Sequence, residues 1–250
     1  MKPIVAAGLV SAVLGGWTPQ ALAQGQPDPL LDRVLYGQLE RWLGAGPLYL
    51  QNVYTWEQGD DSLDFHAAAD NRGSTFTLMR VSDMRVGDED GSWLVGGYNP
   101  LSWSSSDSWH ESRFDWQRTG FVFNYTDPGV YRQVLSDHIL PSQGLRQTYN
   151  WPDHGPTFGA GPDLLVNDRM DTVLSWQLTY GDPDFEGRSI IDGSYGGQYM
   201  QLDAMELYSI SLVPEPGQTT MLLGGLAGLG ALGWLTRRRW PAQRAGLAPA

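Results

Sequence analysis

The sequence predicts a mainly β protein of the α+β class, an antiparallel β-sandwich flanked by short helices, with a single transmembrane helix near the C-terminal end. Three observations lead to this prediction. The apolar residues follow a helical period up to residue 43 and an alternating period from residue 49. About seven short strand-like runs, separated by turn residues, follow in the chain. Residues 221–235 form an apolar run without a charge.

The N-terminal residues have the pattern of a secretory signal peptide. Lys2 precedes an apolar stretch over residues 4–16, and Ala21-Leu22-Ala23 stands directly before Gln24. A positive start, a short apolar core and an Ala-x-Ala site are typical of segments that are removed on export. We therefore expect residues 1–23 to be cleaved, which leaves Gln24 as the N-terminus of an exported protein.

Residues 24–212 are predicted to form one extracytoplasmic domain. Asp28 can cap a helix that ends at Gly44 and Gly46. One face of this helix carries Leu31, Val34, Leu35, Leu39, Trp42 and Leu43. The strand-like runs cover residues 49–54, 75–81, 92–96, 120–125, 129–134, 171–180 and 205–212. The polar or Pro/Gly-rich stretches 102–118 and 141–162 are predicted to be loops, so one or two helices flank a mainly antiparallel sheet.

The composition excludes several classes of site. The chain has no cysteine, so a disulfide framework, a thiol nucleophile and a cysteine–zinc site are impossible. Its only lysine is Lys2, so the exported part cannot contain a phosphate-binding loop with a lysine. The formal net charge is −12, and all 28 acidic residues lie between Asp28 and Glu215. A surface this acidic disfavours nucleic acid and anionic lipid, and we expect no cofactor.

One acidic turn resembles the start of a calcium-binding loop. In residues 182–187, carboxylates stand at the first, third and fifth positions and a glycine at the sixth. The twelfth position is Gly193, where such a loop needs a bidentate glutamate. A solvated acidic turn is therefore the preferred interpretation, with weak surface calcium binding as the alternative, and no metal site is predicted.

Several short motifs follow one another between residues 65 and 208. They are Phe65-His66 with Asp70 and Gly73, Gly96-Gly97-Tyr98 followed by Trp103, Asp115 with Gly120-Phe121-Val122-Phe123-Asn124, Gly155-Pro156-Thr157-Phe158-Gly159 with Asp163-Leu164, and Met205-Glu206-Leu207-Tyr208. In this order they resemble a TLDc domain. The resemblance implies a β-sandwich flanked by helices and brings no established catalytic residues, so a non-enzymatic role is expected. Eukaryotic members are linked to oxidative-stress protection and to a proton-pumping ATPase, a cytosolic partner that an exported protein could not meet.

Most of these matched residues are expected to have structural roles. Glycines are expected where φ is positive or where strands approach closely: Gly73, Gly96, Gly97 and Gly159. Large rings are expected in the core: Trp103, Phe121, Phe123 and Phe158. His66, beside Phe65 at a strand edge, is expected to be a hydrogen-bonded packing histidine. Glu206 is expected to face outward on the last strand.

The C-terminal residues 213–240 combine a short motif, an apolar run and a basic cluster. Pro214 and Pro216 disfavour helix, so Glu215 is presented on an extended backbone. The apolar run of residues 221–235 would span only ~22 Å as a helix, less than the hydrocarbon core of about 30 Å. The cluster Arg237-Arg238-Arg239 follows, and residues 241–250 form a short tail. This order resembles the PEP-CTERM sorting signal of Gram-negative bacteria, which membrane proteases called exosortases read; an ordinary membrane anchor is the alternative.

Three functions remain open at this point. The leading hypothesis is a non-catalytic TLDc-like protein, which an exosortase sorts to the cell envelope or the extracellular matrix, with exopolysaccharide or another envelope protein as its partner. The second hypothesis is a glycan-binding module that uses tryptophans in or near polar loops: Trp103, Trp109, Trp116 and Trp151. The third is a hydrolase that uses acidic loop residues, although no spacing singles out a carboxylate pair.

Overall fold

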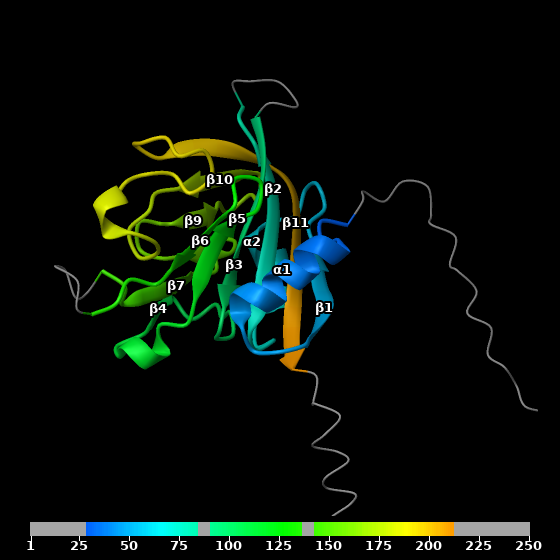
Figure 1. Cartoon of the computed structure of the whole chain (residues 1–250). Coiled ribbons are helices and arrows are strands. Elements are labelled where there is room, and N and C mark those ends of the chain that lie inside the picture. Colours follow the sequence, from blue (N-terminus) through cyan, green and yellow to red (C-terminus); the bar gives the residue numbers. More distant parts are fainter. Residues whose placement is uncertain (1–28, 85–90, 137–142, 213–250) are drawn as a thin grey trace, which may run out of the picture.

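The computed structural model describes residues 29–84, 91–136 and 143–212, and this part of the chain is mainly β (Figure 1). It contains an antiparallel sheet of 11 strands and two α-helices. No helix among these residues is long and apolar enough to cross a membrane. The predicted signal peptide, the sorting signal, the transmembrane helix and the C-terminal tail lie outside the described residues.

The sheet is continuous, but its strands form two groups that meet at the longest strand, β11. The order is β4-β7-β8-β9-β10-β11-β2-β3-β5-β6, and β1 also pairs with β11. The bounds are β1 Leu48–Thr55, β2 Thr75–Ser82, β3 Ser92–Asn99, β4 Ser108–Glu111, β5 Phe121–Asn124, β6 Gly129–Arg132, β7 Arg146–Asn150, β8 Thr157–Phe158, β9 Leu164–Val166, β10 Thr172–Ser175 and β11 Gln198–Leu212. One edge of β11 pairs first with β10 and then with β1, while the other edge pairs with β2.

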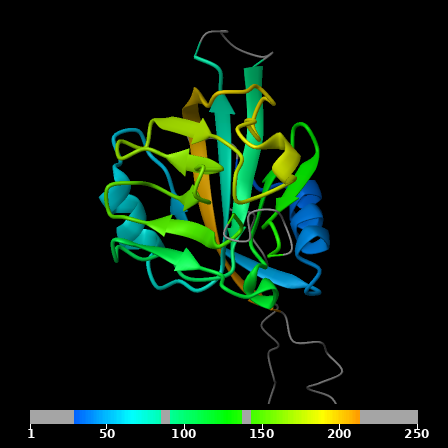
Figure 2. The ribbon, with the colours of Figure 1, turned by 90° about the vertical axis from the view of Figure 1, so that its left-hand side faces the viewer.

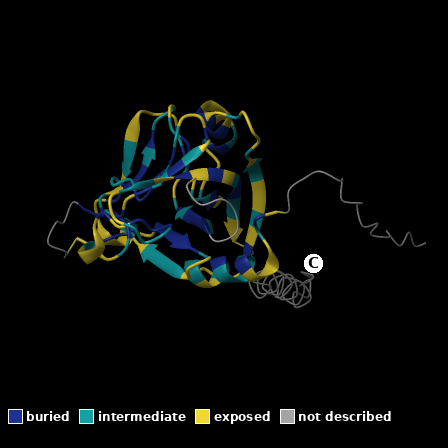
Figure 3. Ribbon diagram, turned by 90° about the horizontal axis from the view of Figure 1, so that it is seen from above, coloured by how far each residue is buried: buried dark blue, intermediate teal, exposed yellow. Residues whose placement is uncertain are grey.

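This division folds the sheet into two layers. In Figure 2 the strands β7–β10 cross in front of β2, β3 and β11; we call β4, β7, β8, β9 and β10 the front layer and the remaining strands the back layer. Side chains from both layers fill the space between them, for example Phe158 and Val173 from the front and Met79 and Val122 from the back. Figure 3 shows these buried stretches inside the fold. The two layers are therefore parts of one curled antiparallel sheet.

Helix α1 (Arg33–Leu43) covers the other face of the back layer. Its N-cap is Asp32, whose Oδ1 accepts from the N–H groups of Val34 and Leu35 at 2.8 and 2.7 Å. The helix ends at Gly44, which has φ 69°. The prediction of Asp28 as the cap was therefore wrong, because the helix begins four residues later than that cap requires. The helix buries Leu35 and Leu39 in a second core with Phe76, Leu78, Phe121 and Phe123.

Helix α2 (Ser62–Ala69) lies in a segment where the sequence showed no helical period. A capping box starts it, because the Asp61 carboxylate accepts from the Asp64 N–H and the Asp64 carboxylate accepts from the Asp61 N–H. Phe65 and Ala69 are fully buried in the core between the layers. The helix carries His66 to the turn that follows β7, and Asp70 is its C-cap.

Several predicted boundaries differ from the structure. The stretches predicted as loops 102–118 and 141–162 contain β4, β7 and β8, which are polar or very short and so lack an alternating apolar pattern. Only 172–175 of the predicted strand 171–180 is a strand, because the chain then leaves the sheet. Strand β11 begins at Gln198, seven residues before the predicted start, and carries a bulge between Leu202 and Ala204.

Two adjacent glycines of β3 allow close packing in the two cores. A Cβ on Gly96 would lie 2.1 Å from the Thr77 carbonyl oxygen, on the α1 side. A Cβ on Gly97 would lie 2.6 to 2.8 Å from three atoms of the Phe158 ring, between the layers. Both glycines therefore serve close approach, as the sequence predicted.

We expect Gly97→Ala to lower the free energy of unfolding by about 1–3 kcal/mol, because the added methyl overpacks the contact with Phe158. Gly37→Ala is the matched control. Its Cβ meets only the end of the Arg41 side chain at 3.5 Å, so helix propensity should leave stability equal or raise it by up to about 1 kcal/mol. Urea unfolding of the full chain measures both changes, and equal values for the two variants would contradict the packing role of Gly97.

Candidate functional site

Three aromatic rings form a strip on the outer face of the front layer, at its β4 edge. The aromatic strip consists of Trp109 of β4, Tyr149 of β7 and Trp151, which follows β7. The rings of Tyr149 and Trp151 are stacked, with centroids 3.5 Å apart and an interplanar angle of 17°. Trp109 meets Tyr149 edge to face at 4.6 Å and Trp151 at 5.9 Å. All three rings are only half-buried, so the strip remains accessible.

Strand pairing and one β-bulge determine where the three rings of the strip lie. Tyr149 lies directly opposite Trp109 in the antiparallel pair of β7 and β4, so both side chains share one face. Trp151 is two residues beyond Tyr149 and lies on the same face. The register shifts between His110 and Glu111, and Gln147 is the extra residue opposite this shift. Both Gln147 and Thr148 are consequently buried, while Arg146 and Tyr149 stay on the outer face.

Charged and polar groups surround the strip. The guanidinium of Arg146 lies 5.0 Å from the Trp109 ring centroid. His154 meets the edge of Tyr149 at 5.2 Å, and its Nδ1 lies 2.9 Å from an Asp153 oxygen. Partial burial raises the pKa of the Tyr149 hydroxyl, and the nearby charges of Asp153 and Asp107 raise it further. The strip therefore offers ring edges and the ring faces that its own stacking leaves uncovered, with hydrogen-bond donors and acceptors beside them.

His66 of α2 supports the turn that carries the strip. The His66 side chain is buried, and its Nε2 lies 3.0 Å from the carbonyl oxygen of Trp151 and 3.1 Å from that of His154. Its Nδ1 lies 2.8 Å from an Asp70 carboxylate oxygen. The prediction of a hydrogen-bonded packing histidine is confirmed, although His66 lies on a helix and not at a strand edge. Its contacts fix the backbone of residues 151–154 from below.

Two of the four tryptophans proposed as sugar platforms have other positions. Trp103 is fully buried, donates from Nε1 to the Thr75 hydroxyl at 3.0 Å and packs against Phe65 and Phe158. Its proposal as a platform was therefore wrong, and its assignment to the core is confirmed. Trp116 is 76% exposed on the turn η2 (Asp115–Gln117), where it stacks on Phe114. Only Trp109 and Trp151 belong to the strip.

Glu206 was predicted to face outward, and this prediction was wrong. Its side chain is buried on the α1 side of β11. The carboxylate accepts from the Leu30 N–H at 3.1 Å and from the Tyr208 hydroxyl at 2.7 Å. Burial and the Glu206 carboxylate raise the pKa of Tyr208 well above its usual range. Glu206 thus fastens the segment before α1 to the sheet.

The motif residue Gly159 lies against a buried carboxylate, Asp163, that the sequence did not single out as a site. Asp163 has no exposed surface, and its carboxylate accepts from the N–H groups of Leu178, Thr179 and Tyr180 at 2.8 to 3.0 Å. Gly159 has φ 73°, and a Cβ there would lie 1.8 Å from an Asp163 oxygen. Burial raises the pKa of Asp163 to about 7 against the opposing effect of these N–H donors. Gly159 and Asp163 therefore form one unit, next to the buried Pro156 and Phe158.

Residues 182–187 form a solvent-facing acidic turn around the short 3₁₀ helix η3 (Pro183–Phe185). Asp182 caps it by accepting from the Asp184 N–H at 3.0 Å, while Asp184 and Glu186 are exposed. In the described part of the chain, no group of three or more histidine, aspartate or glutamate side chains is placed to hold a metal ion. The turn lies at the rim of a large pocket, described below.

No protein-family model matches the chain, and no curated protein matches it. The aromatic strip and its supporting residues must therefore be interpreted by their chemistry.

Proposed function

We propose that this chain is an exported, non-catalytic TLDc-like protein of the cell envelope or extracellular matrix, and that its aromatic strip binds polysaccharide. The observation that carries the proposal is the row of Trp109, Tyr149 and Trp151 on the outer face of a rigid sheet. Sugar rings present C–H faces that pack on aromatic rings, while their hydroxyls need donors and acceptors at the ring edges. Arg146, Asp153 and His154 supply those groups.

The support beneath the strip is consistent with a binding role. Because His66 and the Ser62 hydroxyl, which donates to the Pro152 carbonyl at 2.7 Å, hold the 151–154 turn from α2, the rings need little ordering when a ligand arrives. The acidic surface disfavours nucleic acid and anionic lipid as alternative partners. An extended neutral polymer carries no charge for that surface to repel.

In this proposal, the sorting signals at the two ends of the chain determine where the protein is located. The signal peptide over residues 1–23 sends the chain out of the cytoplasm, and an exosortase processes the signal over residues 213–240 at the membrane. A polysaccharide of the matrix would then be the first abundant partner that the released domain meets. The TLDc resemblance supplies the class of fold in this proposal, and no enzymatic role is assigned.

We expect Trp109→Ala to weaken binding to polysaccharide about tenfold, because one of the three rings of the strip is lost. The measurement is native affinity electrophoresis of the full chain in gels with increasing amounts of neutral soluble glucans, with glycan arrays to extend the range of ligands. Trp116→Ala is the matched control, since it removes an exposed tryptophan outside the strip. Equal retardation of the parent chain and Trp109→Ala on every retarding polysaccharide would contradict the assignment of the strip.

A further inference from the structure

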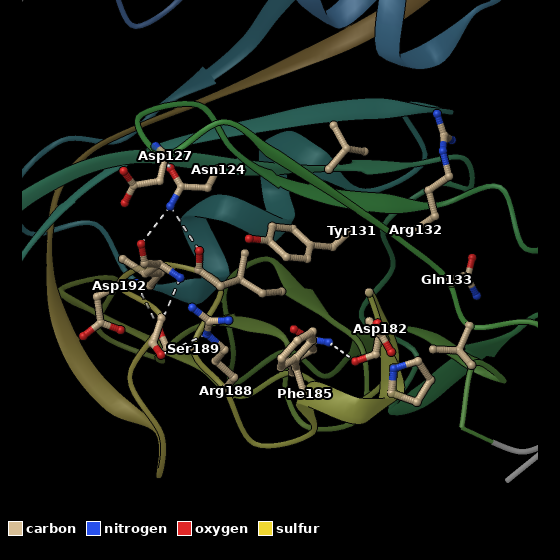
Figure 4. Close-up of a pocket in the computed structure, with 18 of the residues that line it drawn as sticks. Asn124, Asp127, Tyr131, Arg132, Gln133, Asp182, Phe185, Arg188, Ser189 and Asp192 are labelled. Atoms are coloured by element: carbon tan, nitrogen blue, oxygen red, sulfur yellow. Dashed lines mark hydrogen bonds between the residues drawn. The ribbon is translucent and has the colours of Figure 1, made fainter. Parts of the chain in front are cut away.

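A second potential site lies at the seam where the curled sheet closes on itself. Beyond β6 the chain pairs with residues 179–181: Gln133 forms a bridge with Tyr180, the Val134 N–H donates to the Thr179 carbonyl at 2.9 Å, and the Gly181 N–H donates to the Arg132 carbonyl at 2.7 Å. A pocket of about 890 Å³ opens beside this seam (Figure 4). Its volume lies in the range of small-ligand sites, which is roughly 300–1,000 Å³.

Two side chains at the centre of the pocket are held by backbone. A Cβ on Gly181 would lie 3.0 Å from the Tyr131 ring, and a Cβ on Gly193 would lie 2.9 Å from a terminal nitrogen of Arg188. Arg188 also donates from Nε to the Gly193 carbonyl at 3.0 Å and lies over the Phe185 ring at 5.4 Å. Figure 4 shows Tyr131 and Arg188 on facing walls of the pocket. The Gly193 carbonyl thus positions Arg188, and the Tyr131 ring lies against the backbone at Gly181.

The polar groups of the pocket supply both donors and acceptors. Asp127, Asp182 and Asp192 each use one carboxylate oxygen in a hydrogen bond: Asp127 to the Trp93 Nε1–H, Asp182 to the Asp184 N–H and Asp192 to the Ser194 N–H. Within the described residues the second oxygen of each carboxylate forms no hydrogen bond. Arg188 likewise forms no ion pair there, so its terminal N–H groups are available as donors.

This mixture disfavours anionic ligands, because an anion would meet three carboxylates in a protein of net charge −12. A cation could pair with the carboxylates but would leave the donors of Arg188 unused. A neutral ring with several hydroxyls can instead donate to the carboxylates and accept from Arg188. Its apolar face can pack against the rings of Tyr131 and Phe185.

We propose that this pocket binds a single neutral sugar unit, such as the end or a side branch of a neutral polysaccharide. The choice of a sugar among neutral polyols rests on the proposed function, but the pocket and the aromatic strip share no residue. The strip would hold the polymer along its length, and the pocket would recognise one unit. Two sites on one domain raise the avidity for a polymer that can reach both.

Saturation-transfer NMR of the full chain tests this proposal with three monosaccharide probes: a neutral hexose, the corresponding uronate and the corresponding amino sugar. We expect the neutral hexose to give the strongest signal. Arg188→Gln should weaken its binding about tenfold, because a charged donor is lost. Arg169→Gln is the matched control, since Arg169 is exposed and pairs only loosely with Asp171 at 3.7 Å. Its binding should equal that of the parent chain.

Trp109→Ala separates the two sites. Loss of the hexose signal in Arg188→Gln, with retention in Trp109→Ala, would support the pocket even if the strip bound no polymer. Hexose binding that survives Arg188→Gln, a signal from the uronate or the amino sugar alone, or no binding of any probe would overturn the proposal. Melting temperatures of the variants should match that of the parent chain.

Discussion

Asp163→Asn is expected to destabilise the protein by about 2–4 kcal/mol, the largest effect of a change that adds no volume. One oxygen of the carboxylate accepts from Leu178 and Tyr180 and the other accepts from Thr179. An amide replaces one oxygen by an NH₂ group that cannot accept, so a donor faces at least one of these buried N–H groups, whereas both oxygens of a carboxyl group can accept even when one is protonated. Urea unfolding of the full chain measures the change. Asp184→Asn, on the exposed acidic turn, is the matched control and should stay within about 0.5 kcal/mol.

The difference in stability between the parent chain and Asp163→Asn should depend on pH, and this dependence is a second test of Asp163. The pKa of Asp163 is raised from 3.8 to about 7 in the folded protein. Its contribution to stability is therefore full below pH 3.8, falls across the window between the two values, and is lost as pH rises through about 7. The asparagine variant has no such titration, so its deficit relative to the parent chain should shrink from pH 5 to pH 7.5. A deficit that grows over this range would contradict the raised pKa.

Replacing Pro214, Glu215 and Pro216 together by alanine is expected to abolish processing at the C-terminal end. In the proposed sorting signal, a helix over residues 221–235 could extend through the motif once the two prolines are gone, and the extended backbone that we expect a protease to need would be lost. The protein should then stay membrane-bound and uncut. The measurement is the size and location of the mature protein in a host that carries the cognate exosortase and in one that lacks it.

Two further variants separate the parts of the signal. Replacing Arg237, Arg238 and Arg239 by serine should cause premature or misplaced release, because the charges that cannot cross the bilayer are gone. Deleting residues 241–250, which lie beyond the arginines, should change little and serves as the control. Full-length, membrane-held protein in both hosts would mean that the segment is an ordinary anchor.

Local patterns were enough for the parts of the fold whose residues carry their own signal. Strands β1, β2, β5 and β6 were predicted close to their observed places, because their strand-like runs are bounded by turn residues. The end of α1 at Gly44 was also predicted, since few other residues adopt its positive φ. The roles predicted for Gly97 and Gly159 were also correct, because glycine is required where no Cβ fits.

The candidate site depended on contacts between distant parts of the chain. Trp109 and Tyr149 form one surface only because β4 pairs with β7, two polar strands that lack an apolar alternation and are stabilised by pairing. Glu206 can be buried because Leu30 and Tyr208 donate hydrogen bonds to it. The pocket forms because residues 132–134 pair with residues 179–181. The periodicity of a sequence shows which face of a helix or strand is apolar. A site depends instead on which helices and strands become neighbours. The energies of long-range pairing decide this, and no local pattern contains them.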